Sequence, residues 1–144
     1  MSAKVDYTAL KQFRDNLEKL SKTQMQQFTE AAVKDLAARL LRKVKMRTPV
    51  GVYPKVKVSG KKGGTLRRGW RVGAVVKDGS AYTVEIINPT PYASYVEFGH
   101  RTRDHTGWVE GRFMMTISEQ ELQRDAPGIL ERKLNQFLKG AFGA

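Results

Sequence analysis

The stretch PYASYVEFGH, residues 91–100, carries more information about the fold than any other part of this chain of 144 residues. Thr90, just before it, belongs to the residue types that cap helix N-termini, and Pro91 suits the first helical position. Gly99 suits the left-handed position that follows a helix. The pattern therefore predicts a short helix over residues 91–98, about two turns long.

The side chains of this short helix divide between its faces. Tyr92, Tyr95 and Val96 share one face under the three-four spacing of a helix. Ser94 and Glu97 face elsewhere. We therefore expect a helix whose tyrosines lie together on one side.

A longer helix is predicted upstream, over about residues 24–46. Thr23 and Gln26 have the spacing of a capping box at its start, and Pro49 disfavours helix at Thr48. Its apolar stripe is wide enough for the main core helix and consists of Phe28, Ala32, Val33, Leu36, Ala37, Leu40, Leu41 and Val44.

An antiparallel hairpin is predicted between the two helices. Glycines and lysines dominate residues 51–66, which indicates an exposed loop before the hairpin. Asp78-Gly79 is a hairpin turn signal, and Asn88-Pro89 ends the return strand. The alternation of apolar residues places on the inner face Trp70, Val72, Ala74 and Val76 of one strand and Tyr82, Val84 and Ile86 of the other.

The last part of the chain predicts a loop, an extended segment and a helix. Residues 100–112 are polar and broken by glycines, as in a loop, and residues 113–117 (FMMTI) suggest a strand or buried extended segment. Ser118 and Glu121 have capping-box spacing, so the last helix is expected to begin there. Pro127 predicts a kink in it.

These elements together predict an α+β fold with helices on one side of a small antiparallel sheet. The helices are two N-terminal ones, a short central one and a C-terminal one. A chain of this length is expected to form a single domain over residues 1–144, with an N-terminal helix over 1–22, a core over 23–118 and a C-terminal helix over 119–144. The first helix is predicted by the cap Asp6 and the stripe Leu10, Phe13, Leu17 and Leu20.

The composition argues against disulfide-bonded, secreted and membrane-spanning proteins. The chain has no cysteine, which excludes disulfides and thiolate metal sites and is consistent with a reducing compartment. Residues 1–6 lack the apolar centre of a signal peptide, and no run approaches the ~20 apolar residues that span a bilayer. We therefore expect a soluble cytosolic protein without a membrane partner.

The net charge of +12 is concentrated in residues 39–71. The other fourteen of the 26 Lys and Arg are balanced by the fourteen Asp and Glu. This segment has no acidic residue and twelve basic ones, which are Arg39, Arg42, Lys43, Lys45, Arg47, Lys55, Lys57, Lys61, Lys62, Arg67, Arg68 and Arg71. Its helical members lie off the apolar stripe and are expected to be exposed.

The basic excess has three interpretations. Lys and Arg neutralise phosphates without sequence preference, so the segment could face DNA. It could dock against acidic neighbouring proteins, or it could be solvated surface. Only Tyr53 and Trp70 lie nearby to stack bases, so sequence-specific binding is not expected. The candidate DNA- or partner-facing residues are Lys55, Lys57, Lys61, Lys62, Arg67 and Arg68.

Catalytic and metal sites have little support. His100, Asp104 and His105 match no metal-ligand spacing, and no second histidine-rich segment completes a site. A paired base and an orienting group are missing. We predict no catalytic residue, no metal and no cofactor.

Three motifs occur in an order that resembles a family of small neck and tail-component proteins of tailed bacteriophages. They are Thr48-Pro49-Val50, Gly64-Thr65-Leu66-Arg67 and the segment Tyr92–Gly99. In that family the first closes a long helix, the second opens a strand and the third follows a hairpin. The resemblance covers roughly residues 25–118 and thins at Arg112–Ile117, where both prolines of the family's step into the last helix are absent. The motif residues expected to be structural are Thr48, Pro49, Leu66, Arg67, Tyr92, Ala93, Tyr95, Glu97, Phe98 and Gly99.

The resemblance implies a place and a set of partners. It implies a non-enzymatic, ring-forming virion protein at the head–tail neck or the head-proximal end of the tail, which joins or completes the tail. The ring is expected to be a homo-oligomer, with six copies. Its expected neighbours are head-completion, tail-terminator and tail-tube or sheath proteins, with non-specific contact to DNA in the channel. Assembly would take place in the host bacterial cytoplasm.

Two further predictions concern single residues. For Glu97 the motif suggests a structural ion pair, with Arg67, Arg68 or Arg101 as partner. Trp108 lies between glycines in a predicted loop, where a large aromatic side chain is often a partner anchor. The alternative for Trp108 is that it folds back onto its own domain. The candidate interface residues are Arg101, Arg103 and Trp108.

The alternative to a ring subunit is a standalone, non-specific nucleic-acid-binding module. Such a module would be a monomer or dimer whose DNA affinity falls steeply with salt. A ring subunit would bury large patches between copies and bind DNA weakly when unassembled. An enzyme would need a pocket with perturbed titratable groups.

Overall fold

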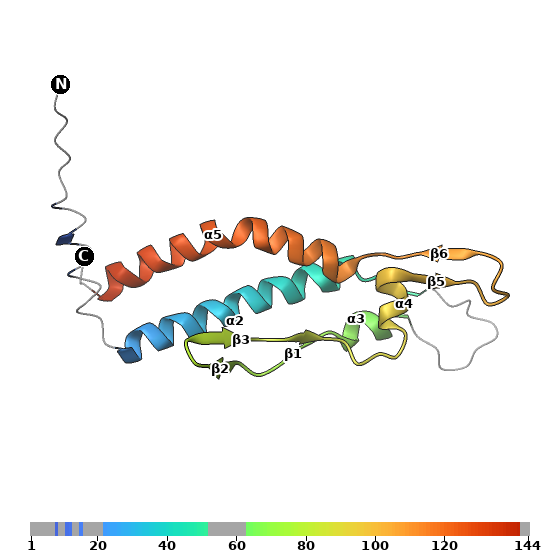
Figure 1. Ribbon diagram of the computed structural model, residues 1–144, viewed down its shortest axis with the longest axis horizontal. Helices are drawn as coiled ribbons and strands as arrows, with labels where there is room; N and C mark the ends of the chain where they lie inside the picture. Colours follow the sequence, from blue (N-terminus) through green and yellow to red (C-terminus); the bar gives the residue numbers. More distant parts are fainter. Residues whose placement is uncertain (1–7, 9–10, 13–14, 16–21, 52–62, 142–144) are drawn as a thin grey trace, which may run out of the picture.

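The computed structural model describes residues 22–51 and 63–141, together with residues 8, 11, 12 and 15. Two long helices, α2 (Lys22–Arg47) and α5 (Met114–Ala141), lie side by side and antiparallel (Figure 1). The shorter elements are α3 (Thr65–Gly69), β1 (Arg71–Val72), β2 (Val76–Asp78), β3 (Ala81–Thr83), β4 (Ile86–Ile87), α4 (Ala93–Phe98), β5 (Gly99–Arg101) and β6 (Trp108–Glu110). The predicted helix over 24–46 is confirmed as α2. The predicted first helix lies outside the described residues, apart from the four isolated positions, which are helical.

The predicted hairpin is confirmed as a long two-stranded ribbon over residues 71–87. β1 pairs with β4 and β2 with β3, both antiparallel, and the amide of Gly73 donates to the carbonyl of Glu85 at 2.8 Å between the two pairs. Gly79 takes a positive φ of 60° at the turn, which glycine adopts without strain. The ribbon lies along α2, which separates it from α5 (Figure 1).

The α+β class is confirmed, but a single small sheet with helices on one side is wrong. The described part has three separate two-stranded sheets, and α2 packs against α5 on one side and the ribbon on the other. A two-stranded ribbon has too little surface to carry a core alone. The pairing of the two long helices therefore takes the place of the single small sheet that was expected to support them.

The inner face of the ribbon differs between its strands. The prediction holds for Tyr82, Val84 and Ile86, which alternate as half-buried residues with exposed neighbours. On the first strand only Trp70 is buried, whereas Val72, Ala74 and Val76 are exposed. The alternation changes by one residue after Trp70, so that Gly73 and Val75 are the more buried positions. Such a shift exchanges the faces of a strand.

The hydrophobic core lies at the end of the helix pair where α2 finishes and α5 begins. Val44, Leu66, Trp70 and Met114 form its buried centre, with partly buried side chains from β4 and α4 around them. The stripe of α2 is buried at Ala32, Ala37 and Val44 and half-buried at Phe28, Val33, Leu36, Leu40 and Leu41. At the opposite end of the pair the rings of Phe28 and Phe137 stack with centroids 4.8 Å apart. Apolar contacts thus hold both ends of the helix pair.

Thr48 joins the end of α2 to the segment that begins at Gly63. Its hydroxyl donates to the carbonyl of Val44 at 2.6 Å and accepts a hydrogen bond from the indole N–H of Trp70 at 2.7 Å. Its carbonyl accepts two hydrogen bonds from the Arg67 guanidinium, at 3.2 and 2.7 Å. A carbonyl at a helix C-terminus lacks an intrahelical partner and attracts a positive charge, so Arg67 satisfies both needs.

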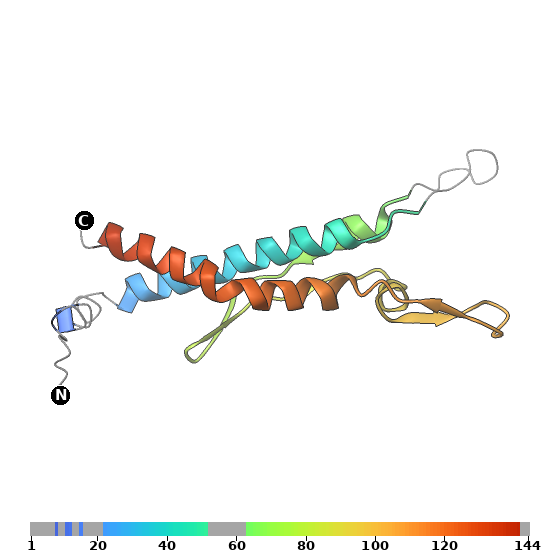
Figure 2. The ribbon, with the colours of Figure 1, turned by 90° about the horizontal axis from the view of Figure 1, so that it is seen from above.

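The prediction of a strand over 113–117 and a helix start at Ser118 is wrong. α5 begins at Met114, and Ser118 lies inside its second turn, fully buried, with its hydroxyl donating to the Met114 carbonyl at 2.6 Å. The helix also continues through Pro127, and its axis changes direction near its middle (Figure 2). Proline removes one backbone hydrogen bond without ending a helix that packing supports.

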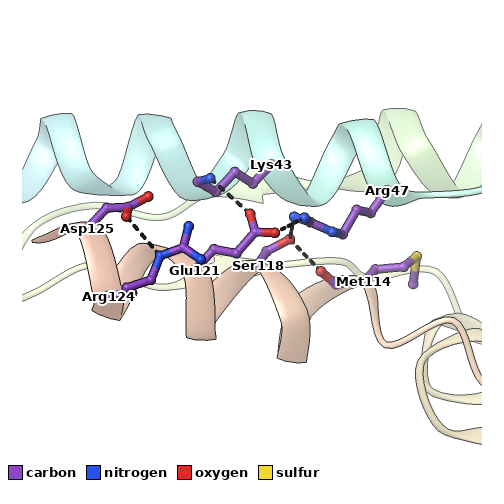
Figure 3. A network of polar contacts seen from close by, with 7 residues as sticks. All are labelled: Lys43, Arg47, Met114, Ser118, Glu121, Arg124 and Asp125. Carbon is purple, nitrogen blue, oxygen red and sulfur yellow. Dashed lines mark hydrogen bonds and ion pairs between the residues drawn. The ribbon is translucent and has the colours of Figure 1, made fainter.

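A polar network ties α2 to α5 beside the core (Figure 3). The Glu121 carboxylate accepts hydrogen bonds from Lys43, at 3.0 Å, and from Arg47. Arg47 also donates to the Ser118 hydroxyl at 3.2 Å. The hydrogen bond from Lys43, followed by that from Arg47, lowers the pKa of Glu121. The expectation that these helical cations are simply exposed is therefore wrong for Lys43 and Arg47, which are about two thirds covered.

A second tie lies further along the helix pair. Asp35 of α2 accepts from Arg39 at 2.7 Å and lies 3.6 Å from the ammonium of Lys133 on α5. The hydrogen bond from Arg39 is the largest cause that lowers the pKa of Asp35, ahead of the attraction of Lys133. Cations on both helices thus surround one carboxylate.

We expect Thr48→Val to destabilise the full chain by about 1–3 kcal/mol, because it leaves the buried indole N–H of Trp70 without an acceptor. Valine keeps the branched shape of threonine, so the core volume changes little. The free energy of unfolding from urea titration measures the loss.

Thr29→Val is the matched control for this prediction. The Thr29 hydroxyl donates to the Met25 carbonyl at 2.9 Å with the same helical spacing, but at an exposed site. Its substitution should change stability by about 0.5 kcal/mol or less. Equal losses for the two variants would show that the Trp70 bond contributes nothing.

Candidate functional site

All three aromatic side chains of the motif segment 92–99 are exposed. Tyr95 is 58% exposed and Phe98 63%, and Tyr92 is exposed as well. Ala93 and Val96 of the same helix pack against the core. The expected grouping of Tyr92 and Tyr95 with Val96 is therefore only partly right, because the tyrosines are exposed while Val96 faces inward. Aromatic residues that the core does not use are available to a partner.

The expected cap of this helix is also different. α4 begins at Ala93, its N-cap position is Tyr92, and no side chain makes a capping hydrogen bond there. Thr90 instead gives its carbonyl to the amide of Ala93 at 3.0 Å. The Asn88 side chain organises this turn, since it accepts from the Thr90 amide at 3.1 Å and donates to the Leu66 carbonyl at 2.7 Å.

Glu97 is the one buried acidic residue of the motif, only 7% exposed, and it caps a different helix. One carboxylate oxygen accepts from the Met115 amide at 2.9 Å. The other accepts from the amide and the hydroxyl of Thr116 at 2.9 and 2.8 Å. The expected ion pair with Arg67, Arg68 or Arg101 is therefore wrong. The free amides and the positive dipole end of α5 take the place of the arginine.

The turn into α5 explains why an external cap is needed. Phe113, directly before the helix, has a positive φ of 48°, a strained value for a side chain of this size. Its amide donates to the Glu97 carbonyl at 3.0 Å, and the Arg112 amide donates to the Val96 carbonyl at 2.7 Å. Both the backbone and the side chain of Glu97 therefore hold the start of α5.

Gly99 is required by close contacts. It has a φ of +87°, and a Cβ atom there would lie 2.5 Å from the Val109 carbonyl oxygen and 3.0 Å from the Trp108 ring. A Cβ on Gly111 would meet the Glu97 carbonyl oxygen at 2.5 Å. The two strands that leave and re-enter the motif region thus approach each other where only glycine fits.

Residues 99–110 form a projecting hairpin, here called the arm, and not the predicted loop. β5 and β6 pair antiparallel with Arg101 opposite Trp108 and His100 opposite Val109. The arm extends away from the helix pair at the end opposite the start of α2 (Figures 1 and 2). A lone two-stranded hairpin buries little apolar surface of its own. Trp108 is 56% exposed, and Val109 is also exposed.

The candidate interface residues all lie on the arm. Arg101 ends β5, Arg103 lies in the connecting turn, and both are exposed. The Trp108 ring lies over Gly99 of the adjacent strand but stays 56% exposed, so it is only partly covered by its own chain. The arm therefore carries an exposed indole and two exposed arginines at one end of the molecule.

The turn of the arm is organised around Asp104. The carboxylate accepts from the Thr102 hydroxyl at 2.6 Å and the Thr106 amide at 3.2 Å. These hydrogen bonds, that from Thr102 first, lower the pKa of Asp104 to about 2. His105 takes a positive φ of 60° within the same turn.

His100, Asp104 and His105 do not come together as a site. Asp104 is occupied by its own turn, and the ring of His100 lies against that of Tyr95, with centroids 5.7 Å apart. The Nδ1 atom of His100 is buried without a hydrogen-bond partner in the described part of the chain. No set of three or more potential ligands for a metal ion gathers within the ranges that the structure describes.

The predicted basic cluster is divided by the structure. Lys55, Lys57, Lys61 and Lys62 lie outside the described residues. Arg67 is bound to the Thr48 carbonyl, and Arg68 donates to the Gly63 carbonyl at 3.1 Å. Arg67 is therefore a structural residue, as the motif suggested, and not a free cation.

Sequence reasoning missed three contributors to this region. The role of Glu121 depends on the pairing of α2 with α5, which brings it to the basic end of α2, and the sequence does not reveal this pairing. Nothing in the sequence around Phe113 predicts its positive φ. Glu110, on β6 beside Trp108, was hidden because residues 100–112 lack the regular alternation of a strand.

Comparison with known proteins gives one family. A family model described as "Bacteriophage HK97-gp10, putative tail-component" matches residues 11–99, more than half of the chain. No curated protein and no solved structure gives a significant match. Among the described residues, no helix has the length and hydropathy needed to cross a membrane.

We expect Glu97→Gln to lower the free energy of unfolding by about 1–3 kcal/mol. Glutamine places an NH₂ group where one oxygen now accepts an amide hydrogen, and it removes the charge that the helix terminus favours. Urea denaturation followed by circular dichroism measures the change. Glu119→Gln, at an exposed position near the start of α5, is the control and should have little effect. Equal stability of both variants would contradict the capping role.

The turn of the arm should lose order in acid. Because folding lowers the pKa of Asp104 from its ordinary 3.8 to about 2, its contribution is fully present above pH 3.8 and is lost as the pH falls through about 2. The Thr106 amide resonance in NMR should therefore titrate with a midpoint near 2. In Asp104→Asn this titration should disappear. A midpoint at the ordinary value would contradict the ordered turn.

Proposed function

This chain belongs to the HK97-gp10-like family of bacteriophage tail components, and we propose that it is a structural ring subunit at the head–tail neck or the head-proximal end of the tail. In this role it joins or completes the tail. Copies of the chain form a closed homo-oligomeric ring, with head-completion, tail-terminator or tail-tube proteins above and below it. The family role is structural, which favours a non-enzymatic function.

One observation carries this proposal: the family motif and the adjoining arm expose aromatic side chains that the core does not use. Tyr95, Phe98 and Trp108 are each more than half exposed, although Trp and Tyr are among the residues that most often anchor interfaces. They lie at one end of an elongated molecule, around a hairpin too small to be stable on its own (Figure 1). A subunit that buries this end against other subunits accounts for both features.

The charges support assembly better than a standalone nucleic-acid-binding module. Arg39 pairs with Asp35, while Lys43 and Arg47 pair with Glu121. Arg67 binds a backbone carbonyl. Arg68 also binds a backbone carbonyl, so five of the twelve basic residues of the charged segment have partners inside the fold and are less available to phosphates.

The location can be tested by imaging assembled particles at a resolution that identifies the chain. A ring of copies at the neck or the head-proximal tail end is the expected result. Density for the chain only at the distal tip of the tail would contradict the proposal. A purified chain that binds DNA tightly, with steep salt dependence, would instead favour the binding module.

The four lysines of the segment 52–62 should be needed for joining heads to tails. We expect replacement of Lys55, Lys57, Lys61 and Lys62 by Gln to leave the fold intact but to yield separated heads and tails. The matched control replaces four exposed lysines from elsewhere in the chain, which are Lys22, Lys34, Lys77 and Lys139. Particle yields in a strain that produces only the variant measure the effect. Normal yields of infectious, DNA-filled particles would leave the four lysines as solvated surface.

A further inference from the structure

An open apolar hollow lies beside α3, on the surface that also carries Tyr92. It has a volume of about 400 Å³ and is lined by Thr65, Gly69, Pro89, Thr90, Pro91 and Tyr92. Two arginines, Arg68 and Arg71, also border it. Arg71 is exposed and has no ion-pair partner in the part of the chain that the structure describes. The hollow therefore combines apolar walls with an unpaired positive charge.

One face of the arm carries a large apolar side chain and an acidic one. Trp108 and Glu110 are two residues apart on β6, so their side chains project from the same face of the hairpin. Both are exposed, and Glu110 has no ion-pair partner among the described residues. Arg101, which lies opposite Trp108, is on the same face, so this face of the arm presents a large apolar ring with one charge of each sign, of which Glu110 can pair with a cation on a neighbour.

These two surfaces are made of different residues of the chain. The Trp108 ring lies over its own Gly99, and the arm projects away from the body that carries the hollow (Figures 1 and 2). They are different patches, so contact between them on two copies is heterologous and repeats from copy to copy. Heterologous contacts are the kind that build closed rings.

We propose that the arm of one copy docks on the hollow of a second copy of this chain, with Trp108 seated against the apolar walls and Glu110 paired with Arg71. The inference depends on the proposed function, because it names the contact that closes the proposed ring. The apolar match supplies burial, and the charge pair sets the orientation of the neighbours.

Engineered cysteines test this contact directly, because the chain has no cysteine of its own. The full-length double variant Glu110→Cys/Arg71→Cys is assembled into particles, oxidised and separated on a non-reducing gel. We expect a ladder of covalent multimers that ends at the ring copy number. Each single variant should remain monomeric. The matched control pairs Glu110→Cys with Asp78→Cys, which lies at the exposed turn of the ribbon and should give no ladder.

A charge exchange provides the second measurement if the cysteine variants fail to assemble. Glu110→Arg and Arg71→Glu should each reduce the yield of assembled particles, and the double variant should restore it, because the pair is then re-formed with reversed signs. A double variant no better than the worse single variant would overturn the proposed contact.

The outcomes distinguish a failure of the arm–hollow contact from a failure of the proposed ring. Particles that carry the chain at the neck but give no ladder, or that give the same ladder with the control pair, overturn the arm–hollow contact and leave the ring. Particles with no copy of the chain at the neck overturn the proposed function and the contact together.

Discussion

The Glu97 carboxylate at the start of α5 is the interaction on which the rest of the structure depends. It gives three acceptor contacts to the first turn of a helix that has no cap of its own. Because Glu97 lies in α4, these bonds join the motif helix to the long helix across the whole length of the arm. They also balance the strained backbone of Phe113, which turns the chain into the helix. Together with the backbone bonds of Arg112 and Phe113 they fix the start of α5 at the base of the arm.

Thr48 has a comparable role at the end of α2. It accepts from Trp70 and receives both guanidinium contacts of Arg67, so the end of α2, α3 and the start of the ribbon meet at one residue. Thr48 bonds to Trp70 of the buried cluster, and Glu97 caps the helix that begins with Met114 of the same cluster. The three family motifs are far apart in the chain, and the fold brings them together around this cluster.

The motif residues then divide by their physical role. Thr48, Leu66, Glu97 and Gly99 are buried, and Arg67 binds a backbone group, so these five hold the fold. The aromatic residues Tyr92, Tyr95 and Phe98 are exposed and contribute little to the core. A single short helix therefore ties the subunit together on one side and presents aromatic surface on the other. This division is what makes a partner-binding role the natural interpretation of the motif.

The sequence by itself determined the features that depend on local periodicity and turn chemistry. The length of α2, the hairpin turn at Asp78-Gly79, the inner face of the return strand and the short helix before Gly99 all follow from neighbours within a few residues. The order of the motifs was also enough to suggest the family.

The partner of Glu97, the start of α5 and the hairpin in residues 99–110 were decided only by the tertiary structure. Each of these depends on groups brought together by folding. A carboxylate binds whichever donors reach it, and here free helix amides reached Glu97 where an arginine was expected. Likewise Ser118 resembled a helix cap in the sequence. The cap is instead Glu97, so α5 begins four residues earlier, at Met114, and no local sequence pattern predicts that contact.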